Sequence, residues 1–496
     1  MPNIDTLRTE IDKFNEEMSR EHYLHYSGQK DKLEIKPIYE KYGYLFTKDL
    51  ALEMRDLMQK TAKREGENLK AIFSFVLFGW IGEKLKVEHE ELANREAELK
   101  ISFKDEQIPY RSVPVRIVNI DDANDRKELY MKKVDADIQL TDQYHKPLLM
   151  KMWEMSELMG LGAYLPTVQT VTEVDYQNLS DIMNAFITDT ENLYVDVFDK
   201  LAKDKVGKPL SKCGYWDTGY LFRGKDYDHI FPADKLVPTM EKFFEDFGFP
   251  LNEMKAITVD VEPRPKKVPR AFCATVKVGK EVYINLQPVG GQKDYTTLLH
   301  ESGHAYHYAF INPDLNVEFK RLGDRAVSEG FAFLFNYLPE NPLWCKRYLG
   351  VDDASGPVYS ELRQKLFFLR RYGAKLAYEI ELHKDNILDG KDQVYKSKLQ
   401  NALKFETPSE NYLVDLDSGF YTADYLRAWI WEVQLRHHLE NKYGKDWFMN
   451  KAAGKEVCEL WKLGKRYPVE EMARQLGYDG IDINPVKQTL IDGLKS

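Results

Sequence analysis

The amino-acid sequence predicts a mainly α-helical protein that contains one small β-sheet. Apolar residues recur at three- and four-residue spacing, with charged residues between them, over most of the chain. Residues 256–288 depart from this spacing, because apolar and polar residues alternate there as they do in half-buried strands. Hydrophobic residues make up 43% of the 496 residues, which supplies a large core and excludes a disordered chain.

Helices are predicted on both sides of this short β region. The clearest helical periodicity lies in six segments, residues 51–75, 142–162, 176–204, 324–338, 360–385 and 422–444. Glycine and proline are scattered along the chain, so no flexible linker is predicted between the helical parts.

The strands are predicted in two stretches of the middle of the chain. Residues 256–262 alternate and are rich in β-branched side chains, and residues 271–288 predict two strands joined near Gly279. Helical spacing then resumes at Thr296 or Thr297, and either hydroxyl could cap the next helix.

That next helix carries the pattern HExxH within residues 297–307. Residues four apart share one face of a helix, so His300 and His304 can bind the same ion. Zinc favours imidazole nitrogen, and a catalytic zinc site uses three protein ligands and a water molecule. Glu301 lies beside this face and can take a proton from the zinc-bound water. The alternative is a surface helix with two ordinary histidines, and the apolar lead-in and Gly303 favour the metal site over it.

A third ligand is needed. The metzincin pattern fails, because His307 and Phe310 stand where a glycine and a histidine are required. A gluzincin site uses a distant glutamate, and Glu318, Glu329 and Glu340 are the candidates. Glu329 is favoured, because it lies in an apolar helix where a carboxylate without a partner is costly to bury; the alternative is an exposed residue at a helix start. His307 could be a fourth ligand, but a catalytic zinc keeps an open position, so a packing role is predicted.

Composition limits the possible partners and the location. The formal net charge is −10, which argues against nucleic acid as a partner. Cys213, Cys273, Cys345 and Cys458 form no CxxC pair, so they predict buried thiols in a reducing compartment. The N-terminus lacks the apolar core of a signal peptide, and the longest apolar run, residues 71–82, is too short to span a bilayer. A cytoplasmic protein with no membrane or nucleic-acid partner is predicted, and no pattern indicates an oligomeric state.

These residues together resemble the thimet oligopeptidase and oligoendopeptidase F family of zinc metallopeptidases. HESGHAYH, residues 300–307, is similar to the family pattern HExGHaxH. Glu329 follows His304 at the family's spacing, and EGFAFLFN resembles its third-ligand helix. The resemblance covers roughly residues 255–480.

The resemblance implies a particular fold. Residues 1–250 would form an N-terminal helical half, and residues 251–496 a catalytic half, with a deep substrate channel between them. A small antiparallel sheet would lie next to the HExxH helix. Its edge strand would pair with the backbone of the substrate, and either residues 271–277 or residues 280–286 would supply that strand.

The resemblance also implies an activity, the zinc-dependent hydrolysis of peptide bonds in short oligopeptides. One zinc ion per chain would be held by His300, His304 and Glu329, with Glu301 activating the zinc-bound water. Tyr421 and Tyr425 could fill two of the family's tyrosine roles at the oxyanion, although the family's histidine is missing nearby; the alternative for both is core packing. A metallocarboxypeptidase or dipeptidyl carboxypeptidase on the same scaffold is the alternative activity, and an inactive peptide-binding protein is the remote one.

Overall fold

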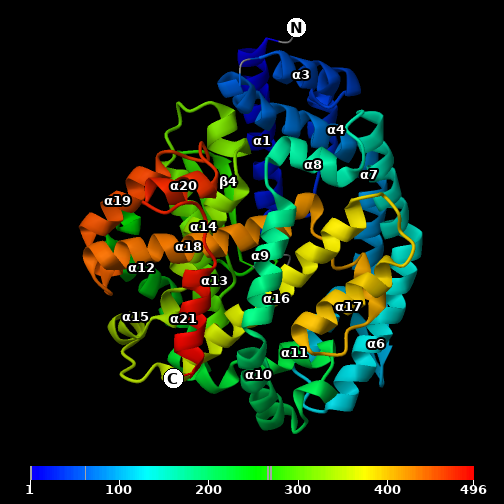
Figure 1. Ribbon diagram of the computed structural model, residues 1–496. Helices are drawn as coiled ribbons and strands as arrows, with labels where there is room; N and C mark the ends of the chain where they lie inside the picture. Colours follow the sequence, from blue (N-terminus) through cyan, green and yellow to red (C-terminus); the bar gives the residue numbers. More distant parts are fainter. Residues whose placement is uncertain (1–2, 62, 265–266, 269–270, 496) are drawn as a thin grey trace. The chain divides into compact units, whose positions relative to one another are not determined.

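The computed structural model is mainly α-helical with small β-sheets, as the sequence predicts (Figure 1). It describes residues 3–495 except residues 62, 265, 266, 269 and 270. The chain divides into two compact units, each assembled from three stretches of sequence. The first unit comprises Met1–Gly79, Gly224–Glu361 and Arg427–Gln488, and the second comprises Trp80–Arg223, Leu362–Leu426 and Thr489–Ser496. The predicted halves, residues 1–250 and 251–496, cut the chain at a different place, and the channel between them stays a prediction.

The first unit holds the HExxH helix. Its complete helices are α1 (Ile4–Tyr26), α2 (Lys36–Lys41), α3 (Lys48–Lys60), α12 (Leu236–Phe247), α13 (Gln292–Phe310), α14 (Arg325–Asn336), α15 (Pro342–Trp344), α19 (Lys451–Trp461) and α20 (Val469–Gln475). It shares four further helices with the second unit, α4 (Lys63–Glu98), α16 (Ser355–His383), α18 (Tyr421–Tyr443) and α21 (Asn484–Lys495).

The core of the first unit is built around α13 and α14, with large aromatic side chains on their outer sides. Phe244 of α12 stacks on Tyr306 of α13 with ring centroids 3.7 Å apart. Phe331 of α14 packs against Trp431 of α18, and both rings are buried. Aromatic pairs of this kind add to the stabilisation that burial itself gives, so the two central helices are fixed from both sides.

A three-stranded sheet lies against α13. Its order is β3 (Ile257–Asp260), β5 (Glu281–Asn285) and β4 (Phe272–Lys277), with β5 in the centre. The hairpin of β4 and β5 is antiparallel as predicted, and it turns at Gly279 with φ +73°. β3 runs parallel to β5, so the sheet is mixed and not purely antiparallel. The reason is that β4 runs antiparallel to β3 with one strand position left between them, and the β4–β5 hairpin then reverses the chain into that position, so β5 runs parallel to β3.

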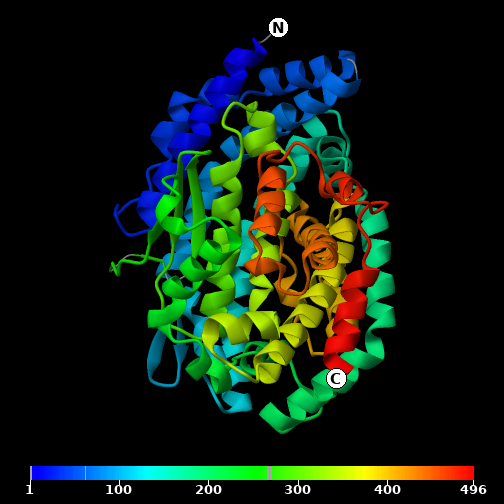
Figure 2. The ribbon, with the colours of Figure 1, turned by 90° about the vertical axis from the view of Figure 1, so that its left-hand side faces the viewer.

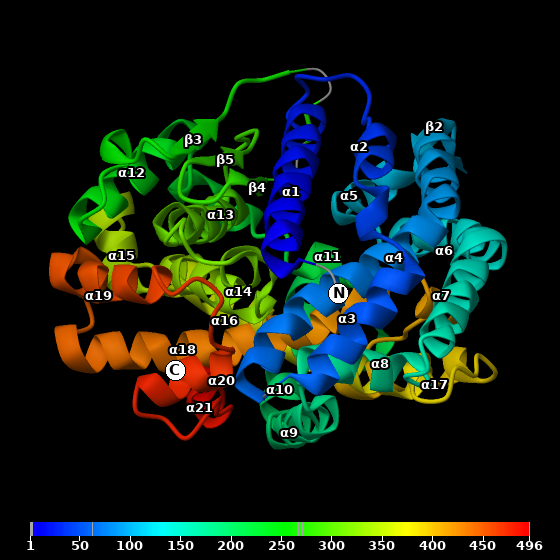
Figure 3. The ribbon, with the colours of Figure 1, turned by 90° about the horizontal axis from the view of Figure 1, so that it is seen from above.

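The helix α1 covers the face of the sheet opposite α13 (Figures 2 and 3). Tyr23 of α1 stacks on Tyr283 of β5 at 3.8 Å, and Arg20 pairs with Glu281 of the same strand at 2.6 Å. The alternate residues of β5, Val282 and Ile284, are buried on the other side. Because side chains alternate along a strand, this pattern places the sheet between α1 and α13.

The second unit is helical apart from one hairpin, β1 (Lys100–Phe103) with β2 (Glu106–Pro109), which is antiparallel. Its complete helices are α5 (Val113–Val118), α6 (Ala123–Leu140), α7 (Lys146–Leu158), α8 (Tyr164–Thr172), α9 (Tyr176–Asp189), α10 (Glu191–Val206), α11 (Tyr215–Leu221) and α17 (Lys391–Leu403). Among the described residues, no helix of either unit has the length and apolar character needed to cross a membrane.

Candidate metal centre

The HExxH helix α13 begins at Gln292, earlier than the predicted start at Thr296 or Thr297. Gly291 precedes it with φ +93°, a backbone conformation that favours glycine. Asp294 in the first turn accepts hydrogen bonds from two main-chain N–H groups ahead of the helix, at 2.7 and 2.8 Å. This carboxylate at the helix N-terminus fixes the start, and the two threonines lie inside the helix.

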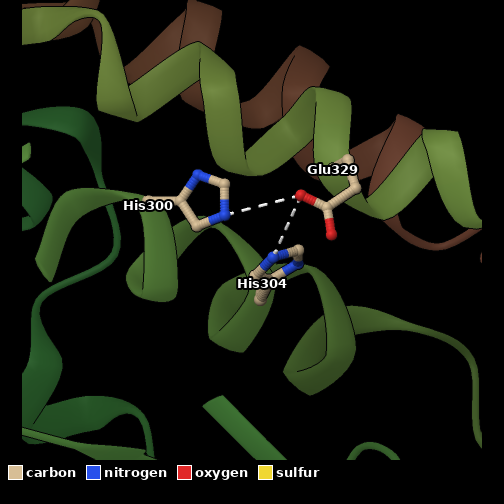
Figure 4. Close-up of side chains that lie close together, drawn as sticks. All are labelled: His300, His304 and Glu329. Carbon is tan, nitrogen blue, oxygen red and sulfur yellow. Dashed lines mark ion pairs between the residues drawn. The ribbon is translucent and has the colours of Figure 1, made fainter. Parts of the chain in front are cut away.

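The three side chains predicted as metal ligands lie together (Figure 4). Nε2 of His300 lies 3.5 Å from Oε2 of Glu329, and Nε2 of His304 lies 3.7 Å from the same oxygen. One ligand atom from each of the three residues lies within 4.8 Å of the others. Ligand atoms that surround a tetrahedral zinc at about 2.1 Å lie about 3.4 Å apart, so the donor set fits a divalent ion.

The two helices that carry these ligands approach each other closely at Gly303. A Cβ atom at this position would lie 2.5 Å from Cα of Ala332 and 2.7 Å from the carbonyl oxygen of Phe331, both main-chain atoms of α14. Only a residue without a side chain allows this approach. Glycine inside the motif therefore brings Glu329 within reach of the two histidines.

A hydroxyl on α14 orients one of the histidines. Nδ1 of His304 lies 2.8 Å from Oγ of Ser328, so Nε2 is the nitrogen that faces Glu329. Burial lowers the pKa of His304 to about 4, although the charge of Glu329 acts in the opposite direction. The imidazole is therefore neutral near pH 7, which is the form that binds a metal ion. The sequence alone does not indicate this position of Ser328, because it depends on contact with another helix.

The N-terminus of α14 is held by buried charges. Asp324, the N-cap residue, accepts hydrogen bonds from Arg427 at 3.0 and 2.7 Å and from the main-chain N–H of Ala326 at 3.0 Å. Arg427 also donates to Glu470 of α20 at 2.7 and 2.6 Å. Burial opposes ionisation of Asp324, but Arg427 and the main-chain N–H groups of Val469 and Ala326 together keep the pKa of this carboxyl below its usual value. These contacts fix the turn from which Glu329 projects.

Glu301, the predicted general base, is half-buried on α13, the helix that packs against β4. Burial, with a further contribution from the charge of Glu301, raises the pKa of the Cys273 thiol well above its usual value. Cys273 lies on β4.

Other residues considered from the sequence lie elsewhere. His307 is fully buried and packs against Tyr308 and Phe331, with ring centroids 5.3 and 4.9 Å away. Glu318 is also buried, and Arg8 of α1 donates two hydrogen bonds to it at 2.9 and 2.7 Å. Neither residue belongs to the group of candidate ligands that the described residues form.

Solved structures resemble the whole chain. An oligoendopeptidase F structure from Bacillus anthracis strain Ames matches with a TM-score of 0.61 and 15% identity, over 98% of this chain and 84% of that one. A second oligoendopeptidase F structure matches with a TM-score of 0.62 and 14% identity, over 98% and 90%. The structure of PZ peptidase A with an inhibitor matches with a TM-score of 0.63 and 15% identity, over 100% and 97%.

The chain has the oligoendopeptidase F fold. No protein-family model and no curated protein sequence matches it. At 14–15% identity the likeness concerns the fold alone.

In this oligoendopeptidase F fold, the two predicted tyrosines lie at the start of α18. Tyr421 and Tyr425 pack edge to face with ring centroids 4.8 Å apart. Both belong to the second unit, whereas the candidate metal ligands belong to the first. Their role at the oxyanion therefore stays a prediction.

The turn ahead of these tyrosines has an unusual backbone. Gly419 has φ +63°, and Phe420 has φ +56°, which is rare for a residue with a side chain. The Phe420 ring packs against Tyr176 of α9 at 4.6 Å and against His383 of α16 at 5.4 Å. A strained residue persists only where its surroundings fix it. Here the rings of Tyr176 and His383 hold Phe420 in place.

Buried charges on α16 hold the same turn. Lys375 donates to Asp417 at 2.7 Å. Glu379 accepts hydrogen bonds from the main-chain N–H of Asp417 at 3.1 Å and from the Thr422 hydroxyl at 3.2 Å. Burial raises the pKa of Glu379 to about 8, although the charge of Lys375 opposes this rise. The sequence alone does not indicate these residues, because α16 and the turn meet only in the folded chain.

Proposed function

We propose that this chain is a zinc-dependent metallopeptidase that hydrolyses peptide bonds within short oligopeptides. The observation that carries the proposal is the convergence of His300, His304 and Glu329 from two helices, within 4.8 Å of one another. The position of Glu301 next to this group and the likeness to oligoendopeptidase F structures support it. The native ion is proposed to be zinc, one per chain, because two imidazoles and one carboxylate are a donor set typical of catalytic zinc.

The proposed roles follow from the chemistry of each side chain. A divalent cation in this position supplies Lewis acidity, which polarises a carbonyl group and lowers the pKa of water. Glu301 acts as the general base that accepts a proton from water and then donates it to the leaving amine. Ser328 keeps His304 oriented through its hydrogen bond at 2.8 Å. Tyr421 and Tyr425 are proposed to stabilise the oxyanion.

The peptide is proposed to bind along β4. The sequence left two candidates for the edge strand, and β5 is in the centre of the sheet, so β4 is the candidate that remains. An extended peptide can add itself to an open strand edge through main-chain hydrogen bonds. β4 packs against α13, the helix that carries Glu301, so a peptide paired with this strand would bind beside that helix.

A cytoplasmic location and the absence of nucleic-acid partners are part of the proposal. The four cysteines form no disulfide, which is typical of a reducing compartment. The net charge of −10 argues against binding to phosphates.

The first experiment is hydrolysis of an internally quenched peptide with both ends blocked, with and without a chelator. Internal cleavage that the chelator abolishes and that zinc restores better than cobalt or manganese is the expected result. Cleavage only of a peptide with a free C-terminus would favour a carboxypeptidase, and cleavage of neither peptide would favour an inactive peptide-binding protein.

The role of Glu301 is tested separately by Glu301→Gln. The variant should retain the metal ion, because Glu301 is not a proposed ligand, and should lose nearly all activity. Equal turnover in the variant and the wild type would refute the assignment of Glu301 as the base.

A further inference from the structure

The outer edge of β4 has few main-chain groups to offer a peptide. The N–H of Val282 donates to Ala256 at 2.9 Å and the N–H of Leu286 to Asp260 at 3.1 Å, so the even-numbered residues of β5 face β3. The odd-numbered residues of β5 therefore face β4. In an antiparallel pair, residues alternate between bonding to the partner strand and pointing away from it.

The register then identifies the outward-facing residues. Cys273 is opposite Ile284 and Thr275 is opposite Val282, so the main-chain groups of Cys273 and Thr275 point to the open edge. Within the described part of the chain, the N–H and C=O of Cys273 have no hydrogen-bond partner. They remain available for a peptide that adds to this edge of the sheet.

The next position along the edge is closed by Arg321. Its guanidinium donates to the carbonyl oxygen of Thr275 at 3.2 Å and to that of Val276 at 2.8 Å. Val276 is the extra residue where the register of the β4–β5 pair shifts, between Thr275 and Lys277. A peptide that extends beyond Cys273 would need the carbonyl oxygen of Thr275 as its next acceptor. This oxygen already accepts a hydrogen bond from Arg321.

Arg321 is held firmly in this position. Its Nε donates to Asp12 of α1 at 2.7 Å, and the side chain is only 8% exposed. Its own carbonyl oxygen accepts from Lys465 at 3.2 Å. At the neighbouring Gly323, a Cβ atom would lie 2.1 Å from the carbonyl oxygen of Lys465, so the segment is packed directly against the chain after α19. The guanidinium cannot move away without breaking several contacts.

We infer that Arg321 terminates the peptide-binding edge and so limits the number of substrate residues on one side of the scissile bond. The inference rests on the proposed function and makes Arg321 a specificity-determining residue, not a catalytic one. A peptide residue opposite Cys273 can form two main-chain hydrogen bonds. The residue two positions further, opposite Thr275, finds the Thr275 carbonyl oxygen already bonded to Arg321 and can accept only the hydrogen bond from the Thr275 N–H.

The test uses two series of blocked peptides with one fixed cleavage site, extended one residue at a time at the N-terminal or the C-terminal end. In the wild type, kcat/KM should rise as the peptide is lengthened. On one side of the scissile bond it should stop rising after a fixed number of residues. In Arg321→Met, the Thr275 carbonyl is released. The next residues on that side should then raise kcat/KM about three- to ten-fold, the effect of one additional hydrogen bond.

Lys320→Met is the matched control. Lys320 pairs with the same Asp12, at 2.6 Å, and carries the same charge as Arg321. Among the described residues, the Lys320 ammonium contacts Asp12 and the carbonyl oxygen of Pro313, at 3.5 Å, and makes no hydrogen bond to β4, so this variant should keep the wild-type length limit. The inference would be overturned if the length limit changed equally in Arg321→Met and Lys320→Met, or if it stayed unchanged in Arg321→Met. In either case the peptidase activity itself would remain.

A scan of the wild type with N-methylated peptides covers the case in which Arg321→Met fails to fold. Methylation of the peptide nitrogen opposite Cys273 should lower kcat/KM, and methylation two residues further towards Thr275 should have no effect. Equal losses at both positions would refute the inference. If no peptide of any length is cleaved, the proposed function fails, which is a distinguishable result.

Discussion

The helix pair α13 and α14 and the turn that carries Tyr421 are both fixed by buried contacts, but the contacts are of opposite kinds. The helices touch through a glycine, Gly303, and are surrounded by aromatic rings. The turn is held by Lys375, Asp417 and Glu379 and contains a strained phenylalanine. Close packing depends on shape and is insensitive to pH, whereas a buried charged network depends on protonation. The two regions should therefore respond differently to mutation and to pH.

The largest effect is expected from Gly303→Ala. The new Cβ would press on main-chain atoms of Ala332 and Phe331, which cannot move as a side chain can. We expect a loss of about 3 kcal/mol in the free energy of unfolding, together with weaker metal binding. Denaturant unfolding measures the stability, and metal titration measures the binding.

Gly82→Ala in α4 is the control, because a Cβ atom at this position meets no atom within 4 Å. This substitution should stabilise the helix by up to about 1 kcal/mol. If Gly303→Ala is as stable as the wild type, the close approach of α13 and α14 does not depend on the missing side chain at Gly303.

In the region of the turn, the substitution Tyr421→Phe tests the proposed catalytic role of a hydroxyl group more than it tests packing. Tyr421→Phe keeps the ring and removes only the hydroxyl. If Tyr421 stabilises the oxyanion, kcat should fall about ten- to a thousand-fold with little change in KM. Steady-state kinetics on the blocked peptide provide the measurement, and an unchanged midpoint of denaturation shows that the fold is intact. An unchanged kcat would leave Tyr421 as a packing residue.

The pH dependence of stability should distinguish the charged turn from the helix pair. Glu379 has its pKa raised from the ordinary value of 4.5 to about 8 by burial. The unfolded chain thus loses this proton at lower pH than the folded chain, so the free energy of unfolding falls as pH rises from 4.5 to about 8. Below that window the contribution is fully present.

Glu379→Gln imitates the protonated side chain and should remove this part of the pH dependence. The difference in unfolding free energy between the variant and the wild type should therefore shift in favour of the variant between pH 5 and pH 8, about the range spanned by the two pKa values. Denaturant titrations at both pH values provide the measurement. If the difference in unfolding free energy between the variant and the wild type is the same at pH 5 and pH 8, a group other than Glu379 causes the pH dependence.

The smallest effect is expected from Ser328→Ala, which removes the hydrogen bond to Nδ1 of His304. Loss of such a partner weakens metal binding about ten- to a hundred-fold. Competition with a chelator measures the affinity. Ser302→Ala is the control, because the Ser302 hydroxyl is also buried on α13 and donates to the carbonyl of Leu298 at 2.7 Å. Equal affinities in the two variants would remove Ser328 from the candidate site.

The parts of the molecule that could be predicted from the sequence depend on local patterns. The four-residue spacing of His300 and His304 fixes their common face, and the apolar surroundings of Glu329 indicate its burial. The periodicity of the helices and the β4–β5 hairpin at Gly279 were also predictable. These features need information from only a few neighbouring residues.

The remaining features depend on residues far apart in the sequence. The parallel pairing of β3 with β5 is set by where the connecting segment crosses. Ser328 faces His304 only because two helices pack closely, and Arg321 reaches β4 from a different segment. Glu318 lies in a charged stretch and is nonetheless buried, because Arg8 pairs with it across 310 positions of the chain. Periodicity contains no information about such partners.

The helix α1 also has a consequence for the synthesis of the protein. Arg20 pairs with Glu281, 261 positions later, and Arg8 pairs with Glu318, 310 positions later. A ribosome that adds about 5–20 residues per second needs about 15–60 s to make that length of chain. For this interval the side of α1 that later covers the sheet has no partner, and the nascent chain is open to aggregation and to chaperones. The helix α1 is thus made before the strands it covers and is among the last elements of the first unit to gain all its contacts.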